Sequence, residues 1–167
     1  MFQKGDLIVY ASTGVCRVED VAPSPFAPER MAYKLVPLYD NGAIYIPVDT
    51  KMFMRPVLTK EEAEALIAAM PAIKGEDYAG AKRPEMLEHY RGFLQSHTCE
   101  DLLRLMKTLY DKDQRLSEGR KRLGTMEQDF KKRAEDLLYG ELAVALDIPL
   151  AEVEPYISAR LEAEEKE

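Results

Sequence analysis

The change from strands to helices falls within residues 40–62, which read DNGAIYIPVDTKMFMRPVLTKEE. Asn41-Gly42 predicts a type I′ hairpin turn, because both residues tolerate positive φ. The β-rich run Ala43–Val48 follows the turn, and Pro47 indicates that this run lies near a strand end or a sheet edge. Thr59-Lys-Glu-Glu62 has the spacing of a capping box, which begins a helix. The stretch therefore divides a β-rich part of the chain from a helical part.

Upstream of this boundary, short runs of Val, Ile, Leu and Tyr are punctuated by Gly5, Gly14 and the proline-rich segment 23–28. These runs alternate only in part, and a turn signal recurs roughly every ten residues. Such short strands favour a small, strongly bent sheet or barrel.

Downstream of the boundary, apolar residues recur with a helical period. The first helix is expected to end near Met70, and Pro84 and Thr98 are expected to begin two more. Ser117 is predicted to cap a long helix that Gly140 interrupts or ends, and a last helix follows Pro149. The fold class is therefore α+β: a small, strongly bent β domain over residues 1–58, then an all-α domain over residues 59–167 with an acidic tail.

Composition excludes several classes of protein. The chain has 167 residues, a net charge of −7, two Cys, two His and no Trp. No apolar run approaches the roughly 18 residues of a membrane span. The opening residues lack the layout of a signal peptide, and two cysteines cannot build a disulfide scaffold. We therefore expect a cytoplasmic protein without a membrane partner.

The charge is unevenly distributed along the chain. Residues 82–133 carry thirteen basic and nine acidic side chains, whereas residues 134–167 carry two and ten. A locally basic helical stretch in an acidic chain can contact phosphate. The alternative is an ordinary solvated helix face with pairs of opposite charge four residues apart.

The search for catalytic motifs finds no phosphate-binding loop, dinucleotide fingerprint or nucleophile elbow. His97 and Cys99 form the only close His/Cys pair, and two side chains cannot complete a tetrahedral zinc site. A helix N-terminus could lower the pKa of Cys99, but a structural role is favoured. We therefore expect a protein that is not an enzyme and that has no metal or cofactor.

Binding is the remaining role, and each domain suggests a mode. The run Ala43–Val48 could pair with a strand of another protein, although the alternative is a hairpin strand paired only internally. Basic side chains of the helical domain could contact phosphates of a nucleic acid. No zinc-finger or leucine-zipper spacing accompanies them, so base-specific contacts should be weak.

Residues 4–21, KGDLIVYASTGVCRVEDV, resemble the signature of the CarD/CdnL family of bacterial transcription factors. Segments 33–35, 44–47 and 54–56 resemble the later strands of that family. In the helical half, segments 86–91, 109–113, 116–119 and 134–143 follow the family's order. The resemblance covers roughly residues 1–146.

The resemblance implies a Tudor-like β domain, shared with the transcription-repair coupling factor, that binds the RNA polymerase β subunit through a strand edge. It also implies a helical domain that contacts promoter DNA near the upstream edge of the −10 region, where an apolar wedge in the minor groove favours the open complex. The candidate polymerase-binding residues are Ala43, Ile44, Tyr45, Ile46, Pro47 and Val48. The candidate DNA-binding residues are Arg83, Met86, Tyr90, Arg91, Arg104, Lys107, Arg120, Lys121, Arg122 and Lys132.

The chain departs from the family pattern at two of these positions. Met86 aligns with the family's wedge tryptophan, and the alternative role for Met86 is helix packing. Tyr45 replaces a basic residue that some members place before the Ile-Pro pair.

Two hypotheses follow. The first is a monomeric transcription regulator that binds polymerase and promoter DNA. The second is an adaptor that docks through the β domain and binds a protein, not DNA, through its helices. The position of the basic residues discriminates between them: a face shared with Met86 favours DNA, whereas pairing with Glu and Asp favours the adaptor.

Overall fold

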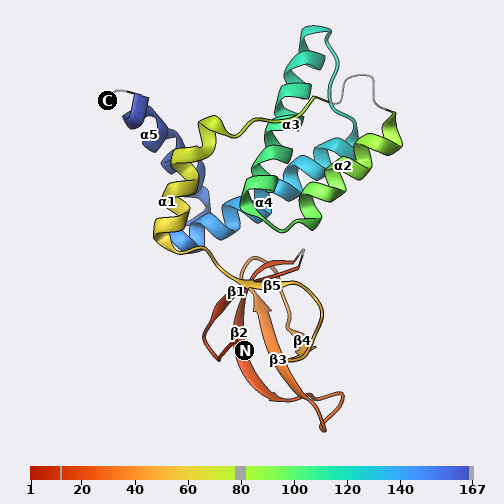
Figure 1. The fold of residues 1–167 in the computed structure, drawn as a ribbon, viewed down its shortest axis with the longest axis vertical. Helices are drawn as coiled ribbons and strands as arrows, with labels where there is room; N and C mark the ends of the chain where they lie inside the picture. The colour runs from red at the N-terminus through yellow and green to blue at the C-terminus, as the bar shows by residue number, and fades with distance from the viewer. Residues whose placement is uncertain (12, 78–81, 166–167) are drawn as a thin grey trace. The chain divides into compact units, whose positions relative to one another are not determined.

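The computed structural model describes residues 1–11, 13–77 and 82–165. Its contacts divide the chain into two compact units, Met1–Leu58 and Thr59–Glu167, which are drawn in Figure 1. The first unit contains the strands and the second contains the helices, so the α+β prediction is confirmed. We describe each unit by itself.

The β unit is a five-stranded antiparallel sheet within the described residues. The strands are β1 Leu7–Tyr10, β2 Gly14–Pro23, β3 Met31–Pro37, β4 Ile44–Pro47 and β5 Met54–Pro56. Their order across the sheet is β4-β3-β2-β1-β5, and β4 therefore lies at an edge (Figure 1). A register shift between Val18 and Asp20 interrupts the pairing of β2 with β3. Such irregularities increase the local twist, which helps so short a sheet to curve around its core.

One face of the sheet forms the core of the β unit. Alternation sends every second side chain to this face, and Ile8, Cys16, Val18 and Leu35 have no exposed surface. Tyr33 and Ile46 complete the buried cluster. Ile46 therefore anchors the edge strand, and its neighbour Tyr45 points to the opposite face.

The β3–β4 connection is a hairpin, but its turn differs from the predicted one. Ile44 pairs with Leu35, so the loop covers residues 38–43 and not the two residues of a type I′ turn. Gly42 has φ +90°, whereas Asn41 is not among the residues with positive φ. The prediction of type I′ was wrong because it inferred loop length from a dipeptide alone.

The helical unit is built from α1 Lys60–Ala69, η1 Met70–Ala72, α2 Arg83–Gln95, α3 Cys99–Glu118, α4 Thr125–Leu146, η2 Leu150–Glu152 and α5 Val153–Glu165. The two long helices, α3 and α4, pack on each other and carry most of the core. Leu105, Leu109, Leu138 and Leu142 are fully buried there. None of the described helices is long and apolar enough to cross a membrane.

Local signals placed two of the helix starts. The capping box at Thr59 is present, since the Thr59 hydroxyl accepts from Glu62 N and the Glu62 carboxylate accepts from Thr59 N. Thr98 caps α3 by accepting from Asp101 N. At α2, Pro84 lies in the first turn as predicted.

Two other boundary predictions were wrong. Ser117 lies inside α3, and the N-cap of α4 is Gly124. Gly140 lies inside α4, which continues to Leu146. Gly140 is buried, and tertiary packing of the neighbouring turns stabilises the helix through it. The acidic tail begins in α5, and residues 166 and 167 lie outside the described residues.

Candidate functional site

The outer edge of β4 offers main-chain hydrogen-bonding groups. Val48 N donates to Met31 O in the neighbouring strand β3. The main-chain groups of successive residues in an antiparallel strand point in alternate directions within the sheet plane. The N–H and C=O groups of Ile44 and Ile46 therefore also point toward β3, and those of Tyr45 point outward from the edge. Pro47 also faces away, but it has no N–H, and its carbonyl accepts from Thr50 N. The Tyr45 N–H and C=O are therefore the central pair that this edge presents.

The six predicted polymerase-binding residues divide between two directions. Ile44 and Ile46 pack against the core of the β unit. Tyr45 and Pro47 are exposed at the edge, while Ala43 precedes the strand and is exposed as well. Val48 follows the strand and packs against the core cluster. Contacts to a partner strand can come from Ala43, Tyr45 and Pro47, not from the whole run.

In the helical unit, the α3–α4 loop and the two flanking helices enclose an open hollow of about 750 Å³. The C-terminal part of α3 contributes Asp113 and Ser117, and α4 contributes Gln128 and Glu135. The positive charge comes from five side chains that line the same hollow: Arg120, Lys121, Arg122, Lys131 and Lys132. Three of the predicted DNA-binding residues are thus consecutive, and Lys132 joins them.

Main-chain hydrogen bonds hold the backbone of the loop that carries Arg120, Lys121 and Arg122. Lys121 N donates to Leu116 O and Arg120 N donates to Ser117 O, which is the bonding pattern of a Schellman motif. Arg120 occupies its left-handed position with φ +59°. The side chains of Arg120, Lys121 and Arg122 are exposed. Clustered cations at a fixed loop can bind phosphate without first ordering the chain.

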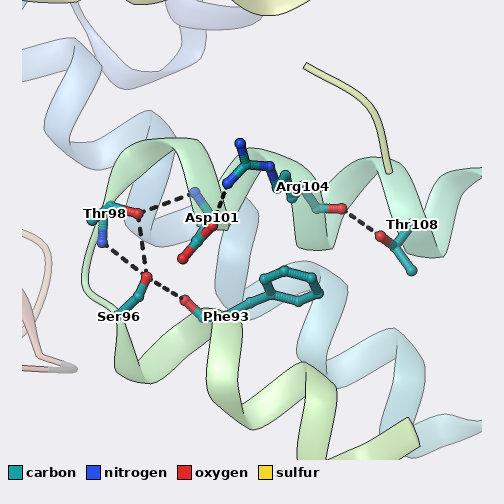
Figure 2. Close-up of polar contacts among 6 residues, drawn as sticks. All are labelled: Phe93, Ser96, Thr98, Asp101, Arg104 and Thr108. Carbon is teal, nitrogen blue, oxygen red and sulfur yellow. Dashed lines mark hydrogen bonds and ion pairs between the residues drawn. The ribbon is translucent and has the colours of Figure 1, made fainter. Parts of the chain in front are cut away.

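Arg104 has a different role. Its guanidinium is 2.7 Å from the Asp101 carboxylate, and its carbonyl accepts from the Thr108 hydroxyl at 2.7 Å. Figure 2 shows these contacts beside the α2–α3 turn, where Ser96 bonds to Phe93 O and to Thr98. Arg104 is therefore engaged in holding the start of α3, and its assignment to DNA stays an untested prediction.

Lys107 is also structural. Its ammonium donates to Met70 O and Ile73 O, the carbonyls at the end of η1 and just beyond it. Burial, together with the nearby Lys74, lowers the pKa of Lys107. A lysine that closes a helix end inside the unit is engaged there, so its assignment to DNA stays an untested prediction that these contacts disfavour.

Tyr90 is the clearest correction. It is 1% exposed, its hydroxyl donates to the Glu127 carboxylate at 2.6 Å, and its ring lies 5.5 Å from that of Phe130. A buried side chain of this kind cannot contact DNA without unfolding the unit. No local sequence pattern indicates this contact, because the partner Glu127 lies 37 residues away.

Met86 lies next to the same polar cluster. It is half-buried on α2, and its sulfur accepts a weak hydrogen bond from Lys112 Nζ at 3.6 Å. Lys112 in turn pairs with Glu127 at 2.7 Å. Met86 does not line the basic hollow. Arg83 and Arg91 are exposed elsewhere on α2. The basic residues and Met86 are therefore not brought together at one hollow.

Four exposed aromatic residues of the described chain lie outside the predicted set, and Phe26 and Tyr110 are the most exposed of them. Phe26 is 82% exposed in the β2–β3 loop, and Tyr110 is 54% exposed on α3 with Lys131 Nζ 5.8 Å from its ring centre. The sequence did carry a signal for Phe26, because an aromatic residue among closely spaced prolines cannot continue a central strand. For Tyr110 the exposed side of the helix depends on tertiary packing.

The catalytic candidates stay structural. Cys99 is buried and donates through its thiol to the Glu141 carboxylate at 3.2 Å. The described residues contain no group of three or more His, Cys, Asp and Glu side chains arranged to hold a metal ion.

The bent sheet with an open edge and the separate helical unit define a β docking domain joined to a helical domain. Residues 2–58 match the family model of the CarD-like/TRCF RID domain. This match of the N-terminal domain supports the CarD-like family, with the domain that it shares with the transcription-repair coupling factor. A domain of this family fits an RNA-polymerase-interacting regulator and points to a non-enzymatic protein. No curated protein matched the chain.

Proposed function

We propose that the chain regulates transcription by binding the β subunit of RNA polymerase through the edge of β4 and promoter DNA through the α3–α4 loop. The match of residues 2–58 to the RID domain carries the proposal. The outward-facing main chain of Tyr45 supports the mode of docking, because an open strand edge binds an extended segment of a partner by β-augmentation.

DNA contact is the second part of the proposal. The five cations of the hollow support it, since phosphate contacts supply sequence-independent affinity that depends on salt. In the bound state, the helical domain lies near the upstream edge of the −10 region and shifts the stability of the open complex. A difference of about 1.4 kcal/mol in binding the open and closed states changes their ratio tenfold.

Met86 is the proposed minor-groove contact, in place of the aromatic wedge. Its partial exposure on α2 leaves part of an apolar side chain available for insertion at a distorted base step. We expect Met86→Trp to lengthen, and Met86→Ala to shorten, the lifetime of the promoter complex. Identical lifetimes for all three proteins would assign Met86 to helix packing alone.

The adaptor is the alternative function. Three observations favour it. Tyr90 and Lys107 form hydrogen bonds inside the helical unit. Arg104 and Arg115 form ion pairs with Asp101 and Asp77, and Lys132 forms one with Asp136. The cations of the α3–α4 loop, Arg120 to Arg122, favour DNA. The regulator is therefore our conclusion, and the adaptor is an outcome of its test.

The test measures capture of purified bacterial RNA polymerase by the full chain. Tyr45→Pro removes the outward N–H but no hydrogen bond to β3, whereas the matched control Tyr45→Phe keeps both that N–H and the aromatic ring. We expect Tyr45→Pro to abolish capture and Tyr45→Phe to retain it. Equal capture by both variants, each with the circular dichroism of the parent, would reject docking at this edge.

A promoter fragment added to the captured complex tests the DNA contact. We expect a supershift that Arg120→Gln with Arg122→Gln weakens. Polymerase capture with a supershift unaffected by these substitutions would leave the adaptor as the better function.

A further inference from the structure

The β2–β3 loop holds an aromatic side chain in water beside the β4 edge. The ring of Phe26 lies 5.8 Å from the ring of Tyr45, and the two planes are nearly perpendicular at 81°. Phe26 is 82% exposed and Tyr45 is 39% exposed. Edge-to-face contact is the preferred geometry of an aromatic pair, so the two rings fix each other's orientation, while most of Phe26 and more than a third of Tyr45 stay uncovered.

The loop itself is held in one shape. Ser24 N donates to Arg30 O at 2.8 Å, and Arg30 N donates to Ala27 O at 2.9 Å. Phe26 N donates to the Ser24 hydroxyl at 3.2 Å. Pro25 and two further prolines in the segment restrict the remaining backbone. Phe26 is therefore held in place before any partner arrives, which lowers the entropic cost of binding.

The charged side chains beside Tyr45 are joined in one network of ion pairs. Lys34 lies opposite Tyr45 in the register of β3 and β4 and so shares its face of the sheet. The Lys34 ammonium is 3.1 Å from the Glu19 carboxylate, and Arg17 lies 3.7 Å from the same group. The cation nearest to the rings thus already has a carboxylate partner. The exposed surfaces of the two rings are themselves apolar and suit an apolar side chain.

The β unit also carries most of the uncovered apolar surface. Among the large apolar side chains exposed in the described part of the chain, eight of eleven belong to residues 1–58. Phe26 and Tyr45 are the two of these whose rings are in contact at the open strand edge. Paired exposed aromatic side chains next to unpaired main-chain groups are typical of the centre of an interface.

We propose that Phe26 and Tyr45 form an aromatic clip that receives an aliphatic side chain from the polymerase segment added at the β4 edge. This inference rests on the proposed function and specifies the chemistry of the partner. The segment bonds to the Tyr45 main chain, and its side chain on that face packs against the exposed surfaces of both rings. Since side chains of a strand alternate, one aliphatic residue at that register determines specificity.

The experiment measures the affinity of the full chain for purified RNA polymerase without DNA. We expect Phe26→Ala to raise Kd roughly 10- to 30-fold, as truncation of a central aromatic contact does. Met52→Ala is the matched control, because Met52 is 53% exposed on the same unit but outside the clip. It should leave Kd unchanged. An apolar contact also predicts that affinity does not fall when salt rises from about 0.1 to about 0.4 M.

The outcomes separate the clip from the proposed function. Binding that Tyr45→Pro abolishes but Phe26→Ala leaves intact would overturn the clip alone. Affinity that falls steeply with salt would overturn it too, by indicating a charged partner. Absence of binding by the parent chain would reject the proposed function and the clip together. A dimer in sedimentation that Phe26→Ala dissociates would mean that the clip covers a second copy of the chain, which also overturns the proposal.

Discussion

At the scale of single residues, Arg120 combines a basic side chain with an unfavourable backbone. Its φ of +59° lies in the left-handed region, which costs a residue with a Cβ about 1 kcal/mol relative to glycine. Gly119, one position earlier, has φ −93° and gains nothing from being glycine. Retaining an arginine where glycine fits best is consistent with a role for its charge.

Arg120→Gly should therefore stabilise the helical unit by about 1 kcal/mol while weakening DNA binding. Arg122→Gly removes the same charge at a position outside the left-handed region, so it should weaken DNA binding without any gain in stability. Urea denaturation, followed by the circular dichroism of the helices, measures the stability of both variants. Equal stabilities of the two variants would mean that Arg120 is not strained.

Cys16 gives a prediction about pH. Burial raises its pKa from the ordinary 9.0 to about 11, so the folded state keeps the thiol protonated where the unfolded state loses its proton. The resulting stabilisation is complete below about pH 9 and is lost as pH rises toward 11. At pH 8 roughly 0.1% of the folded protein carries the thiolate, which is the reactive form.

We therefore expect iodoacetamide to label Cys16 very slowly at pH 8, and at the ordinary rate in urea. Peptide mapping by mass spectrometry follows Cys16 separately from Cys99. Native labelling at the unfolded rate would show that the β unit opens readily.

Residue roles could be predicted from sequence only where the signal is local. Thr59, Thr98 and Pro84 lie within a few residues of the groups that they satisfy, and their roles were identified. Tyr90 and Lys107 bond to groups 37 residues away, and these internal contacts could not be predicted from any local pattern. A side chain that looks free in the sequence is turned inward by packing that no local pattern records.

At the scale of elements, Gly75 and Glu76, which follow η1, lie close against α3. Glu76 N donates to the buried Thr108 hydroxyl at 2.9 Å. A Cβ on Gly75 would lie 2.6 Å from Thr108 N and 2.8 Å from Lys107 C, both backbone atoms of α3. The close approach of the two chains requires glycine at position 75.

Gly75→Ala should thus destabilise the helical unit by roughly 1–3 kcal/mol through overpacking. Gly92→Ala is the matched control, because nothing lies within 4 Å of its added Cβ and it is exposed in α2. That control should stabilise the unit by about 0.5–1 kcal/mol. We expect the urea midpoint to fall for Gly75→Ala and to rise for Gly92→Ala. Equal shifts for the two variants would contradict the close packing of Gly75 against α3.

Elements were easier to predict than their ends. The strand-to-helix change at Thr59 and the edge position of β4 follow from turn, cap and proline signals near the boundary. The end of α3 and the continuity of α4 through Gly140 do not, because buried contacts of the following turn outweigh the propensity of one residue.

At the scale of the whole molecule, the net charge of −7 opposes DNA binding and the α3–α4 loop favours it. Binding should therefore depend strongly on salt, with a slope set by the number of phosphates neutralised. Arg120→Gln with Arg122→Gln should reduce the magnitude of the slope of log K against log salt by about 2.

Arg115→Gln with Arg160→Gln is the matched control for net charge, because Arg115 and Arg160 are paired with Asp77 and Glu64. Its slope should stay that of the parent chain. A common decrease in both double variants would mean that the total charge, and not the loop, governs DNA binding.

The central claim is that polymerase adds a strand at the outer edge of β4, and amide hydrogen exchange of the full chain tests it most directly. The Tyr45 N–H faces outward and should exchange quickly in the free chain, whereas the Ile46 N–H faces β3. Our account predicts that saturating polymerase slows exchange in residues 43–48, with the largest effect at Tyr45. Unchanged exchange in this segment while polymerase is bound would contradict it.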